Sequence, residues 1–511
     1  MTYRISLLTI SACMLLAVQS HAQHSWQKTE HTLSQPQLND GIEYKVESQT
    51  SLSKDKTPLW LNANKYGLSS LDKTNGYMRT TITRPLQTDS ARRWAIGYGV
   101  DVAVPMNYTS NFVVQQAYVE TRWLHGVLTA GAKEYPMELK NQQLSSGSQT
   151  LGINARPVPQ IRIALPEYWQ MPFGGGWLHL KGHLAYGMMT DDSWQHEFTK
   201  KQNRYADNVL YHSKAGYIKV GNEKSKCPLS LEIGLEMAEL FGGKIFRPNK
   251  EGVMERIPTN TGLKAFWYAF VPGGKDATDG MYSNNEGDIV GSWVMRVNYD
   301  KETWKLSVYA DHFFEDHSQM FLQYGWLDGM VGVEATLPKN RFVDNIVYEY
   351  VKTTYQSGPI YHDHTPEIND QISGQDNYYN HNMYAGWQHW GQAMGNPLFV
   401  SPLYNHTADL TFTSNRFRAH HVGFSGNPAA SVHYRLLYTH QRSLGTYPSP
   451  FEHARTLNSF MAEVGYAPQS IGKLNTKGWQ VKAAFALDRG NLIRNNTGFQ
   501  FSLSKTGLLT R

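Results

Sequence analysis

Alternation between bulky apolar residues and small or charged ones recurs along this chain of 511 residues, and it constrains the fold more than any other feature. Between residues 94 and 104 the even positions hold Trp, Ile, Tyr and Val, whereas the odd positions hold Ala, Gly and Asp. Successive side chains of a β-strand point to opposite faces, so a strand here has one apolar face and one small or polar face. Its length matches the roughly 9–11 residues that a tilted strand needs to cross a bilayer.

The same pattern returns in segments 116–123, 178–188, 229–237, 479–487 and 499–504. No stretch after the first 22 residues approaches the roughly 18 consecutive apolar residues of a helical membrane span. Strands with one lipid face and one wet face are typical of bacterial outer-membrane barrels, whose strand counts are even. The sequence therefore predicts an all-β fold, a transmembrane antiparallel β-barrel of about 16–18 strands with a lumen occluded by loops.

The expected connections between strands are of two kinds. Short turns are predicted at 124–126, 300–302 and 488–491, and long loops at 136–149, 272–287 and 357 to about 415. Short turns on one side and long loops on the other are typical of outer-membrane barrels. A soluble β-sandwich or propeller is the alternative, but sandwich strands average only about 5–6 residues, and no propeller repeat of about 40–50 residues is visible.

The first 22 residues have the composition of a secretory signal peptide. A basic start precedes an apolar run over 5–18, and Ser20 and Ala22 are small residues at the positions that a signal peptidase reads. We expect cleavage after Ala22, a polar N-terminal extension over 23–42, and the barrel domain over 43–511. The alternative is that residues 10–13 form a lipobox, with Cys13 as a lipidated N-terminus. Secretion and barrel strands together predict the bacterial outer membrane.

Composition argues against several classes of function. The formal net charge is +5 and no basic block stands out, so no nucleic-acid partner is expected. After the signal only Cys227 remains, so the fold cannot rest on internal disulfides. The densest histidine groups are at 362–364 and 420–421, but no third metal ligand is marked by its spacing. We expect no metal, no cofactor and no catalytic residues. The 30 Tyr and 14 Trp residues fit the aromatic girdles of a barrel.

The stretch 376–404 does not alternate, and it combines planar aromatics with amides, acids and imidazoles. A sugar ring lays its apolar face on an aromatic side chain, while its hydroxyls bond to amides and carboxylates. The alternative is a loop folded into the barrel as a plug, in which Trp and Tyr are packing residues; both can hold together. The candidate carbohydrate-binding residues are Asp376, Tyr378, Tyr379, Trp387, His389, Trp390 and Tyr404.

Four stretches taken in order carry a resemblance to a known family. They are Pro-Leu-Trp-Leu-Asn-Ala-Asn-Lys-Tyr-Gly at 58–67 with Asn-Gly-Tyr at 75–77, Gly-Ile-Asn-Ala-Arg-Pro-Val-Pro-Gln-Ile at 152–161, Glu-Ile-Gly-Leu at 232–235 with Gly-Gly at 242–243, and the stretch 376–404. Together they resemble the capsule assembly Wzi family of outer-membrane proteins, in the form found in Bacteroides-like bacteria.

The resemblance implies a non-enzymatic surface lectin that binds or organises capsular polysaccharide or exopolysaccharide, without a cofactor. Its implied partners are capsular or other surface polysaccharide, outer-membrane lipid, and the barrel-assembly machinery during biogenesis. A porin-type diffusion channel is the alternative function and needs an open lumen. A barrel hydrolase that uses the abundant histidines is a third.

Overall fold

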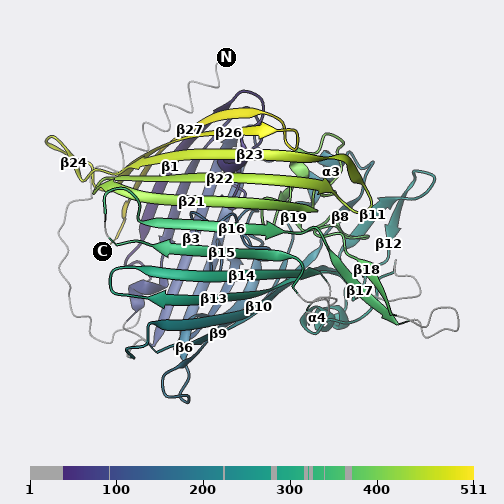
Figure 1. Ribbon diagram of the computed structural model, residues 1–511, viewed down its shortest axis with the longest axis horizontal. Helices are drawn as coiled ribbons and strands as arrows, with labels where there is room; N and C mark the ends of the chain where they lie inside the picture. The colour runs from purple at the N-terminus through teal and green to yellow at the C-terminus, as the bar shows by residue number, and fades with distance from the viewer. Residues whose placement is uncertain are drawn as a thin grey trace.

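Eighteen antiparallel strands close into one barrel (Figure 1). Each barrel strand pairs with the next one along the chain, and the first strand closes the ring on the last, with Thr50 opposite Phe501. The predicted antiparallel barrel and its strand number are confirmed. This computed structural model describes residues 38–90, 93–222, 225–277, 285–315, 320, 326–338, 340–362 and 371–510, with the backbone alone for 357–362 and 371–375.

The barrel strands differ in length but follow one another without a crossover. They are β1 (Glu43–Ser53), β2 (Thr74–Arg84), β3 (Trp94–Met106), β4 (Val113–Trp123), β5 (Gly126–Ala132), β6 (Gln160–Gln170), β7 (Leu178–Met188), β9 (Leu210–Val220), β10 (Leu229–Phe241), β13 (Asp288–Asp300), β14 (Lys305–Glu315), β15 (Gly329–Thr336), β16 (Asn345–Lys352), β21 (Phe417–Ala429), β22 (Val432–Gly445), β23 (Pro450–Tyr466), β26 (Trp479–Gly490) and β27 (Asn496–Leu508).

The two ends of the barrel carry different connections. One end, the turn end, has short links such as 124–125, 301–304 and 430–431, and the small hairpin of β24 (Ser470–Ile471) and β25 (Leu474–Asn475). The other, the loop end, has the links 54–73, 133–159, 189–209, 242–287 and 353–416. In Figure 1 the loop end lies on the right and β24 on the left. The long loops predicted at 136–149, 272–287 and 357 to about 415 all lie at the loop end, as expected. The same end also carries the short links 107–112, 446–449 and 491–495, so the division into short turns and long loops is only partly confirmed.

The loop-end links contain the remaining elements. They are α2 (Leu59–Asn62), α3 (Asp192–Thr199), α4 (Leu263–Phe270), η3 (Pro402–Tyr404), β8 (Tyr205–Asp207), β11 (Lys244–Pro248), β12 (Met254–Ile257), β17 (Ser357–His362), β18 (Gln371–Gln375), β19 (Gln388–His389) and β20 (Gln392–Ala393); η2 (Leu86–Asp89) lies at the turn end. Among the described residues, no helix is long and apolar enough to cross a membrane.

One predicted turn, at 488–491, is wrong. Strand β26 continues through Gly490, and the link 491–495 lies at the loop end. The Asp488 side chain points into the lumen, where it accepts hydrogen bonds from the backbone N–H of Leu59 (3.0 Å) and from Ser459 Oγ (2.6 Å). The acid therefore holds a lumenal helix rather than a turn.

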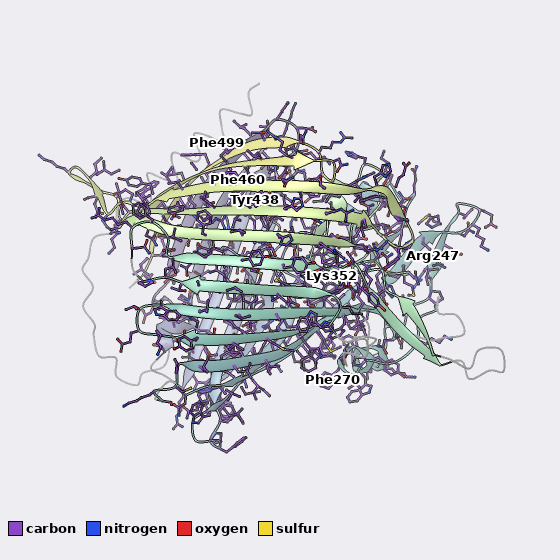
Figure 2. All side chains as sticks on the ribbon, viewed as in Figure 1. Arg247, Phe270, Lys352, Tyr438, Phe460 and Phe499 are labelled. Atoms are coloured by element: carbon purple, nitrogen blue, oxygen red, sulfur yellow. The ribbon has the colours of Figure 1, made fainter. Side chains whose placement is uncertain are left out.

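The alternation in the sequence separates the two faces of the wall. In β3 the odd residues Ala95, Asp101 and Ala103 are buried toward the lumen, whereas Trp94 and Val100 are exposed on the outside. Figure 2 shows the same outer surface on other strands, where Tyr438, Phe460 and Phe499 are labelled. The period of two thus decides which side chains meet lipid and which meet the lumen.

Three loop-end segments, 54–73, 133–159 and 376–415, fold into the lumen and pack together there; we call them the first, second and third segments of the plug. Trp60 of the first segment donates from Nε1 to Thr439 Oγ1 of β22 at 3.2 Å. Leu68 of the same segment packs with Tyr77 of β2 on another part of the wall. Because the plug contacts well-separated strands, it bridges the cross-section of the barrel. The proposed signal segment 1–22 lies outside the described residues.

Candidate functional site

Tyr379 anchors the third plug segment. Its hydroxyl donates to the carbonyl oxygen of Gln149 and accepts the N–H of Asn396 at 3.0 Å, and its own N–H donates to the Glu315 carboxylate. The ring stacks on Phe399 with centroids 3.9 Å apart. Tyr379 is fully buried and has a φ of 67°, a region that bulky residues rarely enter. Its surroundings therefore fix its conformation.

Trp387 joins the third plug segment to the second and to the wall. Its Nε1 donates to the Thr150 carbonyl oxygen at 3.2 Å, and its backbone N–H donates to the Tyr379 carbonyl oxygen at 2.9 Å. The indole stacks on Tyr211 of β9 with centroids 6.2 Å apart. Trp387 is fully buried. Its place in the structure is that of a packing residue.

A small hairpin presents Trp390 on the loop-end side of the plug. Strands β19 and β20 pair, and Trp390 and Gly391 form the turn between them with φ angles of 55° and 76°. Turns with two positive φ angles favour Asn and Gly, and a side chain such as Trp in this region costs about 1–3 kcal/mol. Trp390 is also partly exposed. Backbone strain at a partly exposed aromatic residue is a feature of functional sites.

Residues from other loops hold the Trp390 hairpin. The Asp191 carboxylate accepts the Trp390 N–H at 3.0 Å. The guanidinium of Arg156 lies 4.2 Å from the centre of the Trp390 ring and donates to Ser110 Oγ at 3.0 Å and Thr109 Oγ1 at 2.8 Å. Burial lowers the pKa of Arg156 to about 10, so this residue remains a cation at neutral pH. The arrangement combines an indole, a fixed positive charge and hydroxyl groups.

Both ring nitrogens of His389 form hydrogen bonds within the protein. Its Nε2 accepts the N–H of Thr190 at 3.2 Å, so Nδ1 carries the proton and donates to the Arg156 carbonyl oxygen at 2.9 Å. Burial lowers the pKa of His389, which keeps the ring neutral. The imidazole therefore supports the neighbouring hairpin, and both of its nitrogens are already bonded.

The other candidates lie in different places. Tyr378 is buried and donates to Asp328 Oδ2 at 3.5 Å, and Asp376 is buried nearby in the chain. Tyr404, in η3, is partly exposed, with Lys56 Nζ 5.7 Å from its ring centre. The structure thus brings His389 and Trp390 together at the loop end and buries most of the others. Sugar contact at the seven residues stays a prediction, and Trp390 and Tyr404 are the two with exposed surface.

An aromatic patch beside Trp390 was not predicted from the sequence. Trp194 and Phe198 of α3 stack with centroids 5.0 Å apart, and Trp194 lies 6.4 Å from Trp390. Leu403 packs on the same cluster, which we call the loop-end patch: Trp194, Phe198, Trp390 and Leu403. The spacing of Trp194 and Phe198 places them on one face of a helix, which is the signal that could have found α3.

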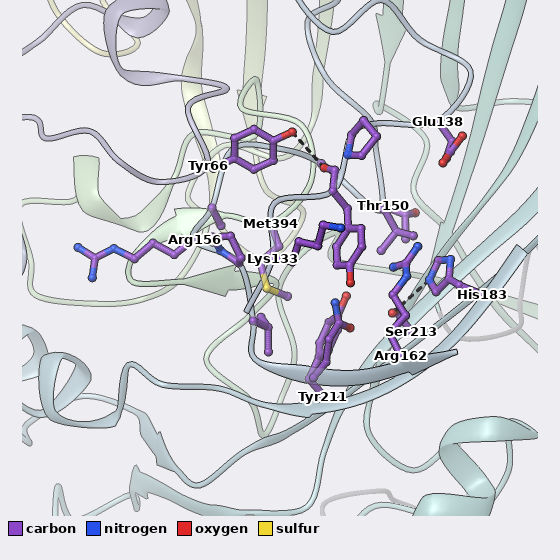
Figure 3. A pocket seen from close by; sticks show the side chains of 18 of the residues that line it. Tyr66, Lys133, Glu138, Thr150, Arg156, Arg162, His183, Tyr211, Ser213 and Met394 are labelled. Carbon is purple, nitrogen blue, oxygen red and sulfur yellow. Dashed lines mark hydrogen bonds between the residues drawn. The ribbon is translucent and has the colours of Figure 1, made fainter. Parts of the chain in front are cut away.

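A second feature is a polar cavity between the second plug segment and the wall strands β6, β7 and β9 (Figure 3). Its volume is about 100 Å³, below the roughly 300–1,000 Å³ of ordinary ligand pockets. Arg162 lies 4.0 Å from the centre of the Tyr135 ring, and Tyr66 Oη donates to the Tyr135 carbonyl oxygen at 3.1 Å. A chamber of this size and polarity suits a few ordered waters.

Ser213 and His183 meet at the edge of this cavity, with 3.3 Å between Oγ and Nε2 (Figure 3). A serine nucleophile needs a histidine that can accept its proton and become an imidazolium. Arg162 and Lys181 are the charged neighbours that act on His183, and both repel an imidazolium. The pair therefore fits a structural hydrogen bond better than a catalytic dyad.

The histidine groups singled out from the sequence do not converge. His421 faces the lumen, 2.7 Å from Thr439 Oγ1 and 2.8 Å from the Leu144 carbonyl oxygen, whereas its neighbour His420 faces outward, 2.9 Å from Tyr348 Oη. Residues 363–364 of the other group lie outside the described residues. Within the part of the chain that the structure describes, no three His, Cys, Asp or Glu side chains gather as a metal site requires.

Comparisons with known proteins place the fold. No family model and no curated protein sequence matches the chain. Among solved structures, the chain is similar to Wzi of Escherichia coli, an outer-membrane protein involved in group 1 capsule assembly and described as a carbohydrate-binding β-barrel. The two are 13% identical, the alignment covers 91% of this chain and 84% of that one, and the TM-score is 0.56. OprD of Pseudomonas aeruginosa is 9% identical, with 93% of this chain and 96% of that one covered and a TM-score of 0.46.

At this identity the similarity to Wzi concerns the fold alone. This similarity in fold agrees with the closed ring of antiparallel strands and with the apolar outer surface of the wall. The resemblance inferred from the four sequence stretches is therefore supported at the level of the fold. The chain has the fold of an outer-membrane β-barrel.

Proposed function

We propose that the protein is a non-enzymatic barrel of the bacterial outer membrane that binds and organises capsular or other surface polysaccharide at its loop end. Barrels of this kind carry their long loops on the extracellular side. The observation that carries the proposal is the strained hairpin that holds a partly exposed Trp390 against Arg156. The fold shared with Wzi agrees with it.

The chemistry around Trp390 suits a sugar chain. The exposed part of the indole offers an apolar surface to the C–H face of a sugar ring. Arg156 covers the ring from one side and fixes its orientation, and its charge favours acidic sugars. The hydroxyls of Thr109, Ser110 and Thr190 lie around the same two residues and can exchange hydrogen bonds with sugar hydroxyls. Trp390 is held in a strained backbone conformation with part of its ring exposed, and strain of this kind is often found at functional residues.

The plug favours binding at the surface over diffusion through the barrel. A porin needs a continuous aqueous path, whereas here the three plug segments pack on one another and on several strands of the wall. Trp390 lies on the loop-end side of the plug and is partly exposed, so a polysaccharide can reach it from that side. The proposed binding needs no movement of the plug.

Trp390→Asn tests the proposal, because asparagine accepts the positive φ angle of the turn but has no aromatic face. We expect the variant to lose at least tenfold in affinity, about 1.4 kcal/mol, for surface polysaccharide extracted from cells that carry the protein. Its unfolding temperature should equal or exceed that of the parent, since the strain is relieved. Binding is measured by calorimetry on detergent-solubilised protein.

Trp304→Asn serves as the matched control, because Trp304 is exposed in the link 301–304 at the turn end. Its affinity should equal that of the parent. Equal affinity of Trp390→Asn and the parent would contradict the proposed site. Stable conductance steps of the parent in a planar bilayer, with no polysaccharide binding, would favour the channel instead.

A further inference from the structure

Helix α4 packs on the outer wall of the barrel, away from the plug. It lies at the loop ends of β9 and β10, to the right of β10 in Figure 1. Ala265 and Ala269, one turn apart, are buried, so the helix lies close to the wall. Phe266 packs against Tyr186 and Phe241, and Tyr186 Oη donates to its carbonyl oxygen at 2.8 Å.

The opposite face of α4 is apolar and uncovered. Leu263 is 91% exposed, Trp267 59%, Phe270 42% and the following Val271 45%. These four positions recur at intervals of four, three and one residues, so they form a single stripe along the helix. Figure 2 shows Phe270 at the margin of the molecule. Lys264 is the one charged residue of the helix, and its Nζ lies 5.2 Å from the Tyr268 ring centre. A helix with apolar residues on both its packed face and its exposed face is characteristic of a buried or membrane-embedded setting.

One charged residue of the wall, Lys214, contacts α4. In β9, Tyr211 and Ser213 face the lumen, so Lys214 faces outward, and its Nζ donates to the carbonyl oxygens of Ala269 at 2.8 Å and Phe270 at 2.5 Å. A lysine on the lipid face costs about 2–4 kcal/mol at the middle of the bilayer but only about 0–1 kcal/mol near its surface. Lys214 therefore places α4 near the surface of the bilayer.

The apolar band of the barrel continues directly from α4 toward the turn end. The outward residues there are Ile218 and Val220 of β9 and Leu231 and Ile233 of β10, all exposed. The exposed stripe of α4 is the continuation of this lipid-facing surface. Contact with a second copy of the chain or with another protein explains the exposed stripe less well. Such a partner would cover α4 but would still leave the adjoining apolar band to lipid.

The turn end shows a comparable feature. Trp94 and Trp123 stack on the outer surface there with centroids 6.0 Å apart. Farther round the ring, Trp304 is exposed in the link between β13 and β14. Tryptophan is enriched at both surfaces of a bilayer, where its ring is apolar and its N–H is wet. Trp267 of α4 supplies such a residue at the loop end.

We infer that α4 lies in the lipid leaflet at the loop end, with Leu263, Trp267 and Phe270 inserted among the acyl chains. The helix extends the lipid-facing band of the barrel and shields Lys214 beneath it. The inference concerns lipid and does not depend on polysaccharide binding.

Nitroxide labels test this placement. In a Cys227→Ser background, Trp267→Cys is labelled and the full chain is reconstituted in vesicles of phosphatidylethanolamine and phosphatidylglycerol. We expect the label at 267 to collide with oxygen, which concentrates in lipid, at least threefold more than with a water-soluble nickel chelate. The mobility of the labelled protein on unheated gels checks that the barrel is still folded.

Two further labelled positions calibrate the result. Ile218→Cys reports the lipid-facing wall, and Leu474→Cys reports water, because Leu474 is exposed in the β24–β25 hairpin beyond the turn end. A label at 267 that behaves like the one at 474 overturns the inference. So does a label that neither reagent reaches, since protein rather than lipid would then cover the helix.

Discussion

Gly395 lies where the second and third plug segments meet, and no side chain fits there. A Cβ atom at this position would lie 1.9 Å from Tyr379 Oη and 2.3 Å from the Gln149 carbonyl oxygen. Those two atoms are joined by the hydrogen bond that anchors Tyr379. The absence of a side chain at Gly395 therefore permits the contact between Tyr379 and Gln149.

Gly395→Ala should loosen the plug. The added methyl group forces Tyr379 away from Gln149, and overpacking of this kind costs about 1–3 kcal/mol. We expect a lower midpoint of thermal unfolding. The midpoint is measured on gels, from the shift of the band of the folded barrel. Gly216→Ala is the control, because nothing lies within 4 Å of the new methyl group. Equal midpoints for the two variants would show that the plug tolerates the methyl group.

The third plug segment, as an element, depends on a neutral histidine. His381 Nδ1 accepts the N–H of Met383 at 3.1 Å, and the ring lies near Arg204. Its Nε2 lies 3.5 Å from Asp276 Oδ2. Burial first, and the positive charge of Arg204 second, lower the pKa of His381 to about 3. The histidine is therefore uncharged in the folded plug across the physiological range.

Acid should destabilise this segment. In the unfolded chain the pKa of a histidine is about 6.5, so between that value and about 3 the unfolded state binds a proton that the folded state does not. The folded plug is therefore stable at a pH above the pKa of His381 in the unfolded chain, and its stability decreases as the pH falls below that value. From pH 7 to pH 5 the loss from His381 is about 2 kcal/mol.

Limited proteolysis of the plug at pH 7 and pH 5 measures this effect. His381→Asn keeps an acceptor for the Met383 N–H and should reduce the pH dependence, whereas His453→Asn, at an exposed position of β23, should leave it unchanged. A pH dependence that is the same in all three proteins would argue against His381 as its source.

Closure of the barrel depends on one strand pairing, between β1 and β27, which we call the seam. The strands at the two ends of the barrel domain, β1 and β27, pair over Glu43–Leu508 to Ser53–Gly498, and this pairing removes the last free edges of the sheet. Gln49 and Ser502 are directly opposite in this pairing. Closure joins segments that are almost the full length of the chain apart.

A disulfide across the seam should form readily. Directly opposite residues of antiparallel strands have Cα atoms about 4.5–5.5 Å apart, within the range of disulfides. In a Cys227→Ser background, Gln49→Cys with Ser502→Cys should oxidise almost completely and give a more compact band on heated, non-reducing gels. Gln49→Cys with Ser504→Cys, offset by two residues from the register, should cross-link much less. Similar yields for both pairs would place the register elsewhere.

By itself, the sequence determined the barrel and its two faces. The alternation over 94–104 assigns the residues of this strand to the correct faces, because side-chain direction in a strand depends only on the local period of two. The long loops were also found locally, from the loss of alternation. For the same reason His420 and His421 had to face opposite ways, although only the structure showed their partners.

Only the tertiary structure decided where the aromatic loops go. The stretches around Trp387 and Trp267 are both rich in aromatic residues, yet one fills the lumen and the other lies on the outer wall. Their partners, Thr150 in one case and Tyr186 in the other, come from distant parts of the chain. The sequence marked the stretch that contains Trp390, but Arg156 and Asp191 reach it from two other loops. Contacts between loops depend on closure of the ring, and no local pattern encodes them.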